Sequence, residues 1–170
     1  RWEIREALKT NRVSAVWVTH DQQEAMSVGD RIGVLNCGKL VQLDSPEACY
    51  RYPIDKFVAS FLGEASFLPA EINGMIAKTE LGNVDAKLIE NNKEQNSILI
   101  RPWDCNVEVA EDNNAIVEWL RYEGATKAAS VLLSSGNRVL IRIANSFNLS
   151  AGDAVKISLD ERRSYTIFSS

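Results

Sequence analysis

The sequence has few cysteines, a single histidine and no long apolar stretch. No run of about eighteen apolar residues occurs in it, so we predict no membrane-spanning helix. Cys37, Cys49 and Cys105 are widely spaced and form no CxxC pair, which argues against a zinc or redox motif. We therefore expect free thiols in a reducing compartment and no metal site.

The sequence also lacks a basic surplus. Its formal net charge is −4 and its isoelectric point is about 5.1. Nucleic-acid binders usually carry an excess of Lys and Arg, because phosphate contacts provide their affinity. An OB-like nucleic-acid binder is therefore disfavoured, and we expect no nucleic-acid partner. No GxSxG elbow occurs, which sets aside a serine hydrolase built on the one histidine.

The N-terminal residues do not have the pattern of a signal peptide. Residues 1–11 are charged and amphipathic and contain no apolar core segment. The first residue is Arg1 rather than Met, and we expect a piece that starts inside a longer protein.

Residues 1–64 mix helix and strand signals. Apolar positions at helical spacing predict a helix over 2–9. The β-branched run VSAVWVT predicts a strand over 13–19, buried on both faces of a mainly parallel sheet. Asp21, with Glu24 three positions on, is typical of a capping box and predicts a helix that ends by residue 29. Further signals predict a hairpin of strands 31–36 and 40–43, and helices that begin after Ser45 and Asp55.

From residue 66 onward, short strand patterns alternate with turns. Strands are expected at 67–76, 85–89, 97–100, 115–122, 128–133, 138–143, 154–159 and 164–168, with a loop over 90–95. Strands at this spacing predict a small OB-like barrel. The fold class predicted for the whole chain is an α/β part followed by an all-β part, with domains over 1–64 and 65–170.

His20 is the residue best placed for chemistry. It stands in the segment VTHDQQEA, directly after the predicted buried strand. Ligands bind at the carboxyl ends of strands in open α/β sheets, and an imidazole there can bind a phosphate oxygen or position a water. The alternative is a solvated histidine beside a helix N-terminus.

The segment around His20 resembles the switch-histidine segment of ABC ATPases, whose usual form is THDQ followed by one residue and EA. The likeness continues in order through DRIGVLN, GKL with a following Gln, SPE, and FVASFLG. Each piece alone is weak evidence, but together they cover residues 1–64 in the right order and spacing. The resemblance implies that residues 1–64 are the C-terminal end of an ABC ATPase domain.

The second half is similar to the accessory β domain of importer ATPases, often called TOBE. The likeness rests on ILIRP at 98–102, although the family pattern has an acidic residue next and this chain has Trp103 before Asp104. Gly63-Glu64 followed by short strands is most similar to the ferric-iron-type subunits. The sulfate, sugar and polyamine types are close competitors.

The resemblance implies a role for each matching residue. His20 would contact the γ-phosphate of ATP and help to hold the attacking water, with Asp21 and Gln22 beside it, in the closed dimer of the complete subunit. ATP and Mg²⁺ are the implied cofactors of that subunit. The implied partners are a second copy, the membrane permease subunits and, indirectly, a solute-binding protein, at the cytoplasmic face of the inner membrane. Without the rest of the ATPase domain, we expect residues 1–36 to be loose, rearranged or paired with another copy.

The β half carries residues that fit either a binding surface or ordinary packing. Four aromatic residues could form a ligand-stacking face or fill a small core: Trp103, Trp119, Tyr122 and Tyr165. Four basic residues could form a strip or a solvated face: Arg121, Lys127, Arg138 and Arg142. The strand over 138–143 could pair with a second copy along an exposed edge. The resemblance implies dimerisation or regulation, and the alternative is a stand-alone ligand- or oxyanion-binding β module.

The sequence predicts that these 170 residues alone neither hydrolyse ATP nor bind it tightly. They contain no GxxxxGK[ST] loop, whose backbone amides would surround the phosphates, and no LSGGQ-type signature. Isothermal titration of the chain with ATP and Mg²⁺ should give no saturable heat at micromolar ATP. A stoichiometric binding curve in that range would contradict the prediction.

Overall fold

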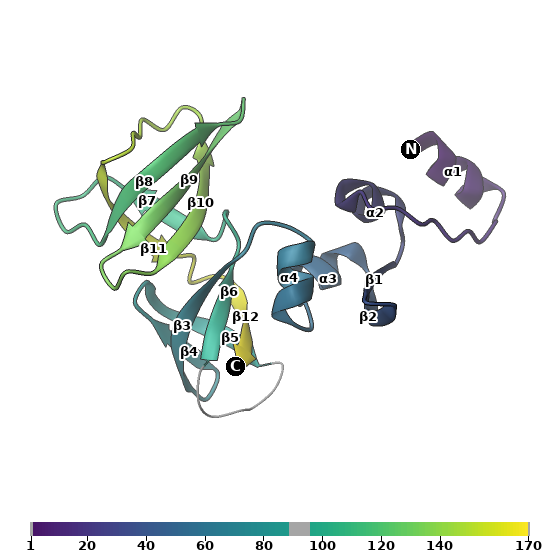
Figure 1. Cartoon of the computed structure of the whole chain (residues 1–170), viewed down its shortest axis with the longest axis horizontal. Coiled ribbons are helices and arrows are strands. Elements are labelled where there is room, and N and C mark those ends of the chain that lie inside the picture. Colours follow the sequence, from purple (N-terminus) through teal and green to yellow (C-terminus); the bar gives the residue numbers. More distant parts are fainter. Residues whose placement is uncertain (1, 89–95, 170) are drawn as a thin grey trace. The chain divides into compact units, whose positions relative to one another are not determined.

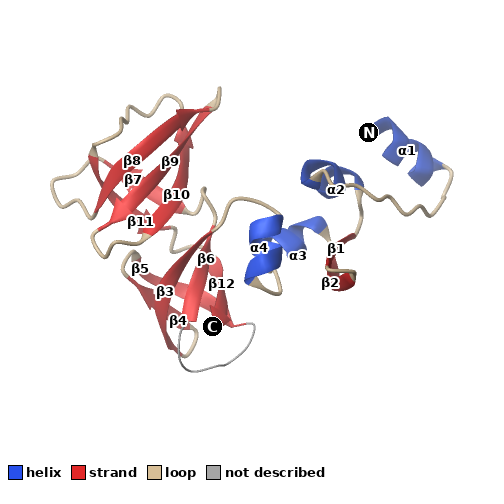
Figure 2. Ribbon diagram, in the orientation of Figure 1, coloured by secondary structure: helices blue, strands red, loops and turns tan. Residues whose placement is uncertain are grey.

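The computed structural model describes residues 2–88 and 96–169. They form two compact units, Arg1–Gly63 and Glu64–Ser170, here called the N-terminal unit and the β unit. Figures 1 and 2 show that the helices lie in the N-terminal unit and that most strands lie in the β unit. None of the described helices is long and apolar enough to cross a bilayer. The predicted fold class, an α/β part followed by a mostly β part, is confirmed.

The N-terminal unit contains four short helices and one hairpin. The helices are α1 (Trp2–Thr10), α2 (Gln22–Val28), α3 (Pro46–Arg51) and α4 (Lys56–Phe61), and the hairpin strands are β1 (Ile32–Asn36) and β2 (Lys39–Asp44). Three of the helices have a polar N-cap residue, whose side chain accepts a hydrogen bond from the backbone N–H three residues further along the chain. The donors are Glu24 to Asp21 (3.0 Å), Ala48 to Ser45 (3.2 Å) and Val58 to Asp55 (2.7 Å).

A small core holds the hairpin against α3 and α4. Its buried residues are Ile32, Val34, Cys49, Val58 and Leu62. Burial raises the pKa of the Cys49 thiol, which is consistent with a packing role. The predicted hairpin and the helices after Ser45 and Asp55 are therefore present, and all three meet in this core.

The predicted strand over residues 13–19 is wrong. These residues carry no regular secondary structure, and the Val16 and Val18 side chains are 94% and 88% exposed. A strand exists only through hydrogen bonds to a neighbouring strand, and the described residues pair no strand with this segment. Its apolar, β-branched composition favours a strand, but without a neighbouring strand its backbone groups have no partners in a sheet.

The β unit contains a closed barrel of five strands. They are β3 (Ser66–Asn73), β4 (Ile76–Thr79), β5 (Gly82–Leu88), β6 (Asn96–Ile100) and β12 (Ser164–Ser169), in the order β12-β5-β4-β3-β6. The last strand, yellow in Figure 1, pairs parallel with β5 and antiparallel with β6. A segment far along the sequence therefore closes the barrel.

A second sheet is formed by the strands that lie between β6 and β12 in the sequence. They are β7 (Cys105–Glu108), β8 (Ala115–Tyr122), β9 (Thr126–Leu133), β10 (Arg138–Ala144) and β11 (Ala154–Leu159). Their order is β10-β9-β8-β11-β7, so β10 and β7 are the two edges. One buried cluster contains side chains of both the barrel and this sheet, among them Ile98, Ile167, Val131 and Ile141.

The strand predictions failed where strands are very short or where a turn divides them. The run expected over 67–76 contains nearly all of β3 and only the first residue of β4, because Gly74 has a φ of +64° and reverses the chain between these two strands. Strand β7, only four residues long, was not predicted. The loop expected over 90–95 lies outside the described residues.

Removing a buried side chain from the barrel should destabilise the β unit far more than the same change on its surface. Ile167→Ala, at a fully buried position, should lower the free energy of unfolding by about 3 kcal/mol, because it leaves a cavity. Ile116→Ala, at a position that is 51% exposed, should cost less than about 1 kcal/mol. Urea denaturation followed by circular dichroism measures both, and equal losses would contradict the shared core.

Candidate functional site

His20, Asp21 and Gln22 lie together where the chain enters α2. The Thr19 hydroxyl donates to Glu24 Oε2 at 2.5 Å and accepts from the Asp21 N–H at 3.0 Å. Asp21 is the N-cap of α2. These bonds fix the loop against the first turn of the helix, so the backbone on both sides of His20 is held by local contacts.

The three predicted site residues have different exposures. The His20 side chain is exposed, whereas Asp21 and Gln22 are half-buried. The Asp21 carboxylate accepts the Glu24 N–H, so its clear structural role is to cap the helix. Within residues 2–88 and 96–169, no three His, Cys, Asp or Glu side chains are grouped so as to hold a metal ion.

The four aromatic residues considered as a ligand-stacking face do not all lie on the surface. Tyr165 is buried, and its hydroxyl donates toward the carbonyl oxygens of Asp104 and Asp160 at 3.3 and 3.2 Å. Trp103, Trp119 and Tyr122 are exposed. Among these four residues, only Tyr165 packs in the core.

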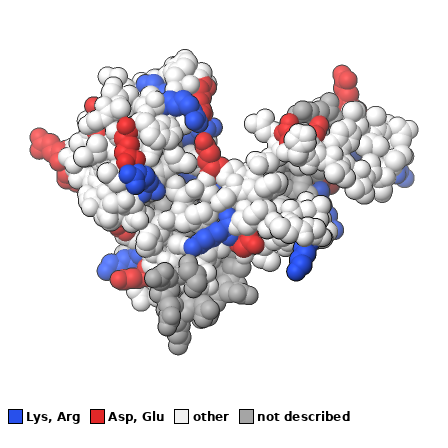
Figure 3. All heavy atoms as spheres, viewed as in Figure 1, with Lys and Arg blue, Asp and Glu red and all other residues white. Residues whose placement is uncertain are grey.

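Of the four basic residues that could form either a strip or a solvated face, the three arginines are paired with carboxylates. Arg138 binds Glu118 at 2.8 Å. Glu64 and Glu123 each contact both Arg121 and Arg142, with the Arg142 pairs at 3.0 and 2.8 Å. On the face shown in Figure 3, acidic and basic side chains of the β unit are mixed rather than gathered by sign. The Lys127 ammonium donates to the Phe147 carbonyl oxygen at 2.9 Å.

The edge of β10 is partly occupied by its own chain. Its Leu140 N–H donates to the Ser66 hydroxyl at 2.9 Å, and its Arg142 N–H donates to the Pro102 carbonyl oxygen at 2.7 Å. The strand lies at the end of its sheet, as the pairing hypothesis requires. A second copy that paired along this edge would have to displace both bonds.

The loop after β6 is organised by Asp104, a residue that the sequence did not mark as structural. Its carboxylate accepts the Arg101 N–H at 2.6 Å and contacts the Arg163 guanidinium at 2.6 Å. Asp104 is buried, and this burial raises its pKa although the bond to the Arg101 N–H and the Arg163 charge oppose the shift. The only sequence signal was an acidic residue two positions after the ILIRP segment.

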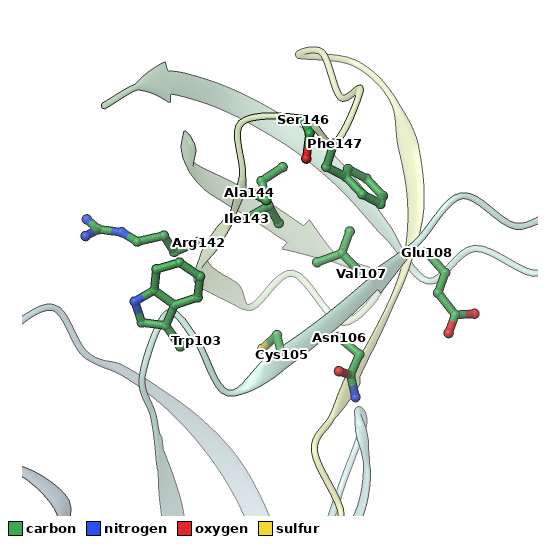
Figure 4. A pocket seen from close by; sticks show the side chains of 10 residues that line it. All are labelled: Trp103, Cys105, Asn106, Val107, Glu108, Arg142, Ile143, Ala144, Ser146 and Phe147. Carbon is green, nitrogen blue, oxygen red and sulfur yellow. The ribbon is translucent and has the colours of Figure 1, made fainter. Parts of the chain in front are cut away.

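Trp103, in the same loop, borders a hollow in the surface of the β unit. The hollow has a volume of about 490 Å³ and lies between β7 and β10 (Figure 4). Most of its residues come from these two strands, and Ser146 and Phe147 come from the turn that follows β10. The sequence did not predict this hollow, because the two strands are distant in the sequence.

Comparison with known proteins shows homology to the ATP-binding subunits of ABC importers, at about 30% identity. The chain is 29% identical over 168 residues to the Fe(3+) ions import ATP-binding protein FbpC of Haemophilus influenzae, a match that covers 95% of the chain and 48% of that protein. It is 31% identical over 159 residues to the spermidine/putrescine import ATP-binding protein PotA of Mesorhizobium japonicum, covering 88% and 44%.

A third relative is the sulfate/thiosulfate import ATP-binding protein CysA of Xanthomonas campestris. It is 32% identical over 173 residues, covering 99% of the chain and 48% of that protein. The chain thus spans about half the length of the curated relatives it matches. No family model matches it.

The raised pKa of Asp104 predicts a specific dependence of stability on pH. Because the folded chain binds this proton more tightly than the unfolded chain, the stabilisation from protonating Asp104 is complete below the unfolded pKa, near 3.8. It is lost as the pH rises through the folded value. Relative to Asp104→Asn, the wild-type free energy of unfolding should therefore increase on acidification from pH 7 to pH 4. A difference between the two proteins that does not change with pH would contradict this assignment.

Proposed function

We propose that this chain is the C-terminal portion of the ATPase subunit of an ABC importer, which couples ATP hydrolysis to solute uptake. The observation that carries the proposal is the extent of the homology. The matches to importer ATPase subunits run through 88% to 99% of the chain and so include both the N-terminal unit and the β unit. A relation limited to one unit would not distinguish an importer subunit from a protein that shares only that unit.

In this proposal, His20 binds the γ-phosphate of ATP in the complete, dimeric subunit. Its exposed imidazole can donate to a phosphate oxygen or orient the attacking water, and Thr19 and Asp21 fix the backbone that presents it. Phosphoryl transfer depends mainly on positioning and charge stabilisation, so a held imidazole is sufficient for this role. Asp21 caps the helix beside the phosphate, Gln22 lies next to it, and Mg²⁺ arrives with the nucleotide.

The β unit serves dimerisation and regulation in this proposal. The partners are a second copy of the subunit, the membrane permease subunits and, indirectly, a solute-binding protein, at the cytoplasmic face of the inner membrane. The second candidate is a stand-alone ligand-binding β module. An oxyanion ligand for such a module has little support, because the arginines considered for it already bind carboxylates.

Ferric iron is the solute that we propose. Its support is the sequence around Gly63-Glu64 and the similarity to FbpC proteins of two Haemophilus influenzae strains, both named for the import of Fe(3+) ions. Relatives named for polyamine and sulfate import have similar identities, so uptake assays with iron, spermidine and sulfate must separate the three.

The role of His20 can be tested in the complete subunit. His20→Ala should lower ATP hydrolysis by about 10² or more, because the γ-phosphate loses a positioned hydrogen-bonding group. ATP binding should change little, since most phosphate contacts lie elsewhere in this proposal. Gln23→Ala, an exposed neighbour on α2, is the matched control and should retain the wild-type rate. Undiminished hydrolysis by the His20 variant would overturn the assignment.

A further inference from the structure

The hollow of the β unit lies where the second sheet fails to close. Strands β7 and β10 are its two edges and are not paired with each other. One hydrogen bond, from the Arg142 N–H to the Pro102 carbonyl oxygen, closes the gap next to Trp103. Beyond this bond the edges remain open, and the partly buried Cys105, Val107 and Phe147, which pack against the core, form part of the hollow's lining.

Unpaired backbone groups line both sides of the hollow. In an antiparallel pair, only every second residue of a strand bonds to the neighbouring strand. The Asp160 N–H donates to the Asp104 carbonyl oxygen, and the pairing of β7 with β11 continues in the same register from this bond. The N–H and C=O groups of Cys105 and Val107 therefore point away from β11, toward the gap. On β10, the Arg142 N–H points away from β9, toward Pro102. Because the direction of the N–H groups alternates along a strand, the Ala144 N–H also points away from β9.

Where β7 and β10 come closest, the gap between them is too narrow for another strand. Cα atoms of β7 and β10 approach within 8 Å. A strand inserted between them would need roughly 9.5 Å, which is twice the usual spacing between strands. The volume of about 490 Å³ is nevertheless within the range of about 300–1,000 Å³ that is typical of small-molecule sites. The occupant that fits is therefore a small molecule that is thin in one direction.

The side chains around the hollow favour an uncharged ligand. Trp103 lies on one side of the hollow, and Phe147 and Val107 lie on the other (Figure 4). The Arg142 side chain runs beside the Trp103 ring and away from Val107, and its guanidinium is bound by Glu64 and Glu123. Burial raises the pKa of Cys105 to about 12, so this thiol stays neutral. Glu64 and Glu123 hold Nη2 of Arg142, and its Nε has no hydrogen-bond partner among the described residues but is buried, so it offers no exposed charge to an anion. The lining carboxylate, Glu108, is directed away from Trp103 and Val107 (Figure 4), so it does not favour a cation between them.

We infer that the hollow between β7 and β10 is a binding site for a small, uncharged, planar heteroaromatic molecule. Such a ligand stacks on Trp103 and contacts Phe147 and Val107 with its apolar surface. Its ring nitrogen or N–H pairs with the free backbone groups of Cys105 or Val107, or its ring nitrogen with the Ala144 N–H; the Ala144 carbonyl oxygen already accepts the Phe147 N–H. The site lies entirely within the β unit and does not depend on the ATPase assignment.

Nuclear magnetic resonance of the full 170-residue chain, titrated with indole and separately with quinoline, tests this site. Indole brings a ring N–H and quinoline a ring nitrogen acceptor, so together they probe both kinds of backbone group. With at least one probe, saturable shifts should appear at the Trp103 indole N–H and at the backbone amides of Cys105, Val107 and Ala144. The indole N–H of Trp119, which is exposed in the same unit but outside the hollow, should not move. Sulfate and molybdate should cause no saturable shift at these positions.

Matched variants separate specific binding from loose association with aromatic rings. Trp103→Ala should weaken binding about tenfold by removing the stacking surface, whereas Trp119→Ala should bind as the wild type does. Ser146→Trp, at an exposed position on the rim, should fill the hollow and abolish binding even if Trp103→Ala proves unstable. The inference fails if neither probe saturates, if all tryptophans shift alike, or if the filled variant binds normally.

Discussion

The β unit depends on the insertion of β12 between β5 and β6. This pairing closes the barrel, and the chain returns to it only after passing through every strand of the second sheet. The outgoing segment after β6 and the incoming segment before β12 are therefore neighbours. They are joined by the bond from the Asp160 N–H to Asp104, by the Asp104–Arg163 ion pair and by the Tyr165 hydroxyl. The buried position of Asp104 follows from this crossing.

The same crossing explains why the second sheet has open edges. Its first strand, β7, begins directly after the loop that contains Asp104, and its register with β11 continues the contact between Asp104 and Asp160. Strand β11 lies on one side of β7, and β10 borders the hollow on the other side but bonds to Ser66 and Pro102 instead. The hollow is thus a consequence of how the chain enters and leaves the barrel.

Local features of the fold could be predicted from the sequence, and pairing could not. The caps at Asp21, Ser45 and Asp55 act within a few residues, so their helices were predicted close to the observed positions. Most strands of the β unit were also predicted. Their distribution between a barrel and a second sheet was not, because it depends on contacts such as Ile167 with Ile98 that no local pattern encodes. The strand expected over 13–19 failed for the same reason.

The closure of the barrel by β12 has a consequence for synthesis. Strand β6 ends at Ile100 and β12 begins at Ser164, so a growing chain must wait for more than half of the β unit before the barrel can form. Until then the edges of β5 and β6 are unpaired and available to other chains. Any truncation before β12 makes this exposure permanent. The ribosome-bound intermediate is therefore the state in which this protein most needs protection from aggregation.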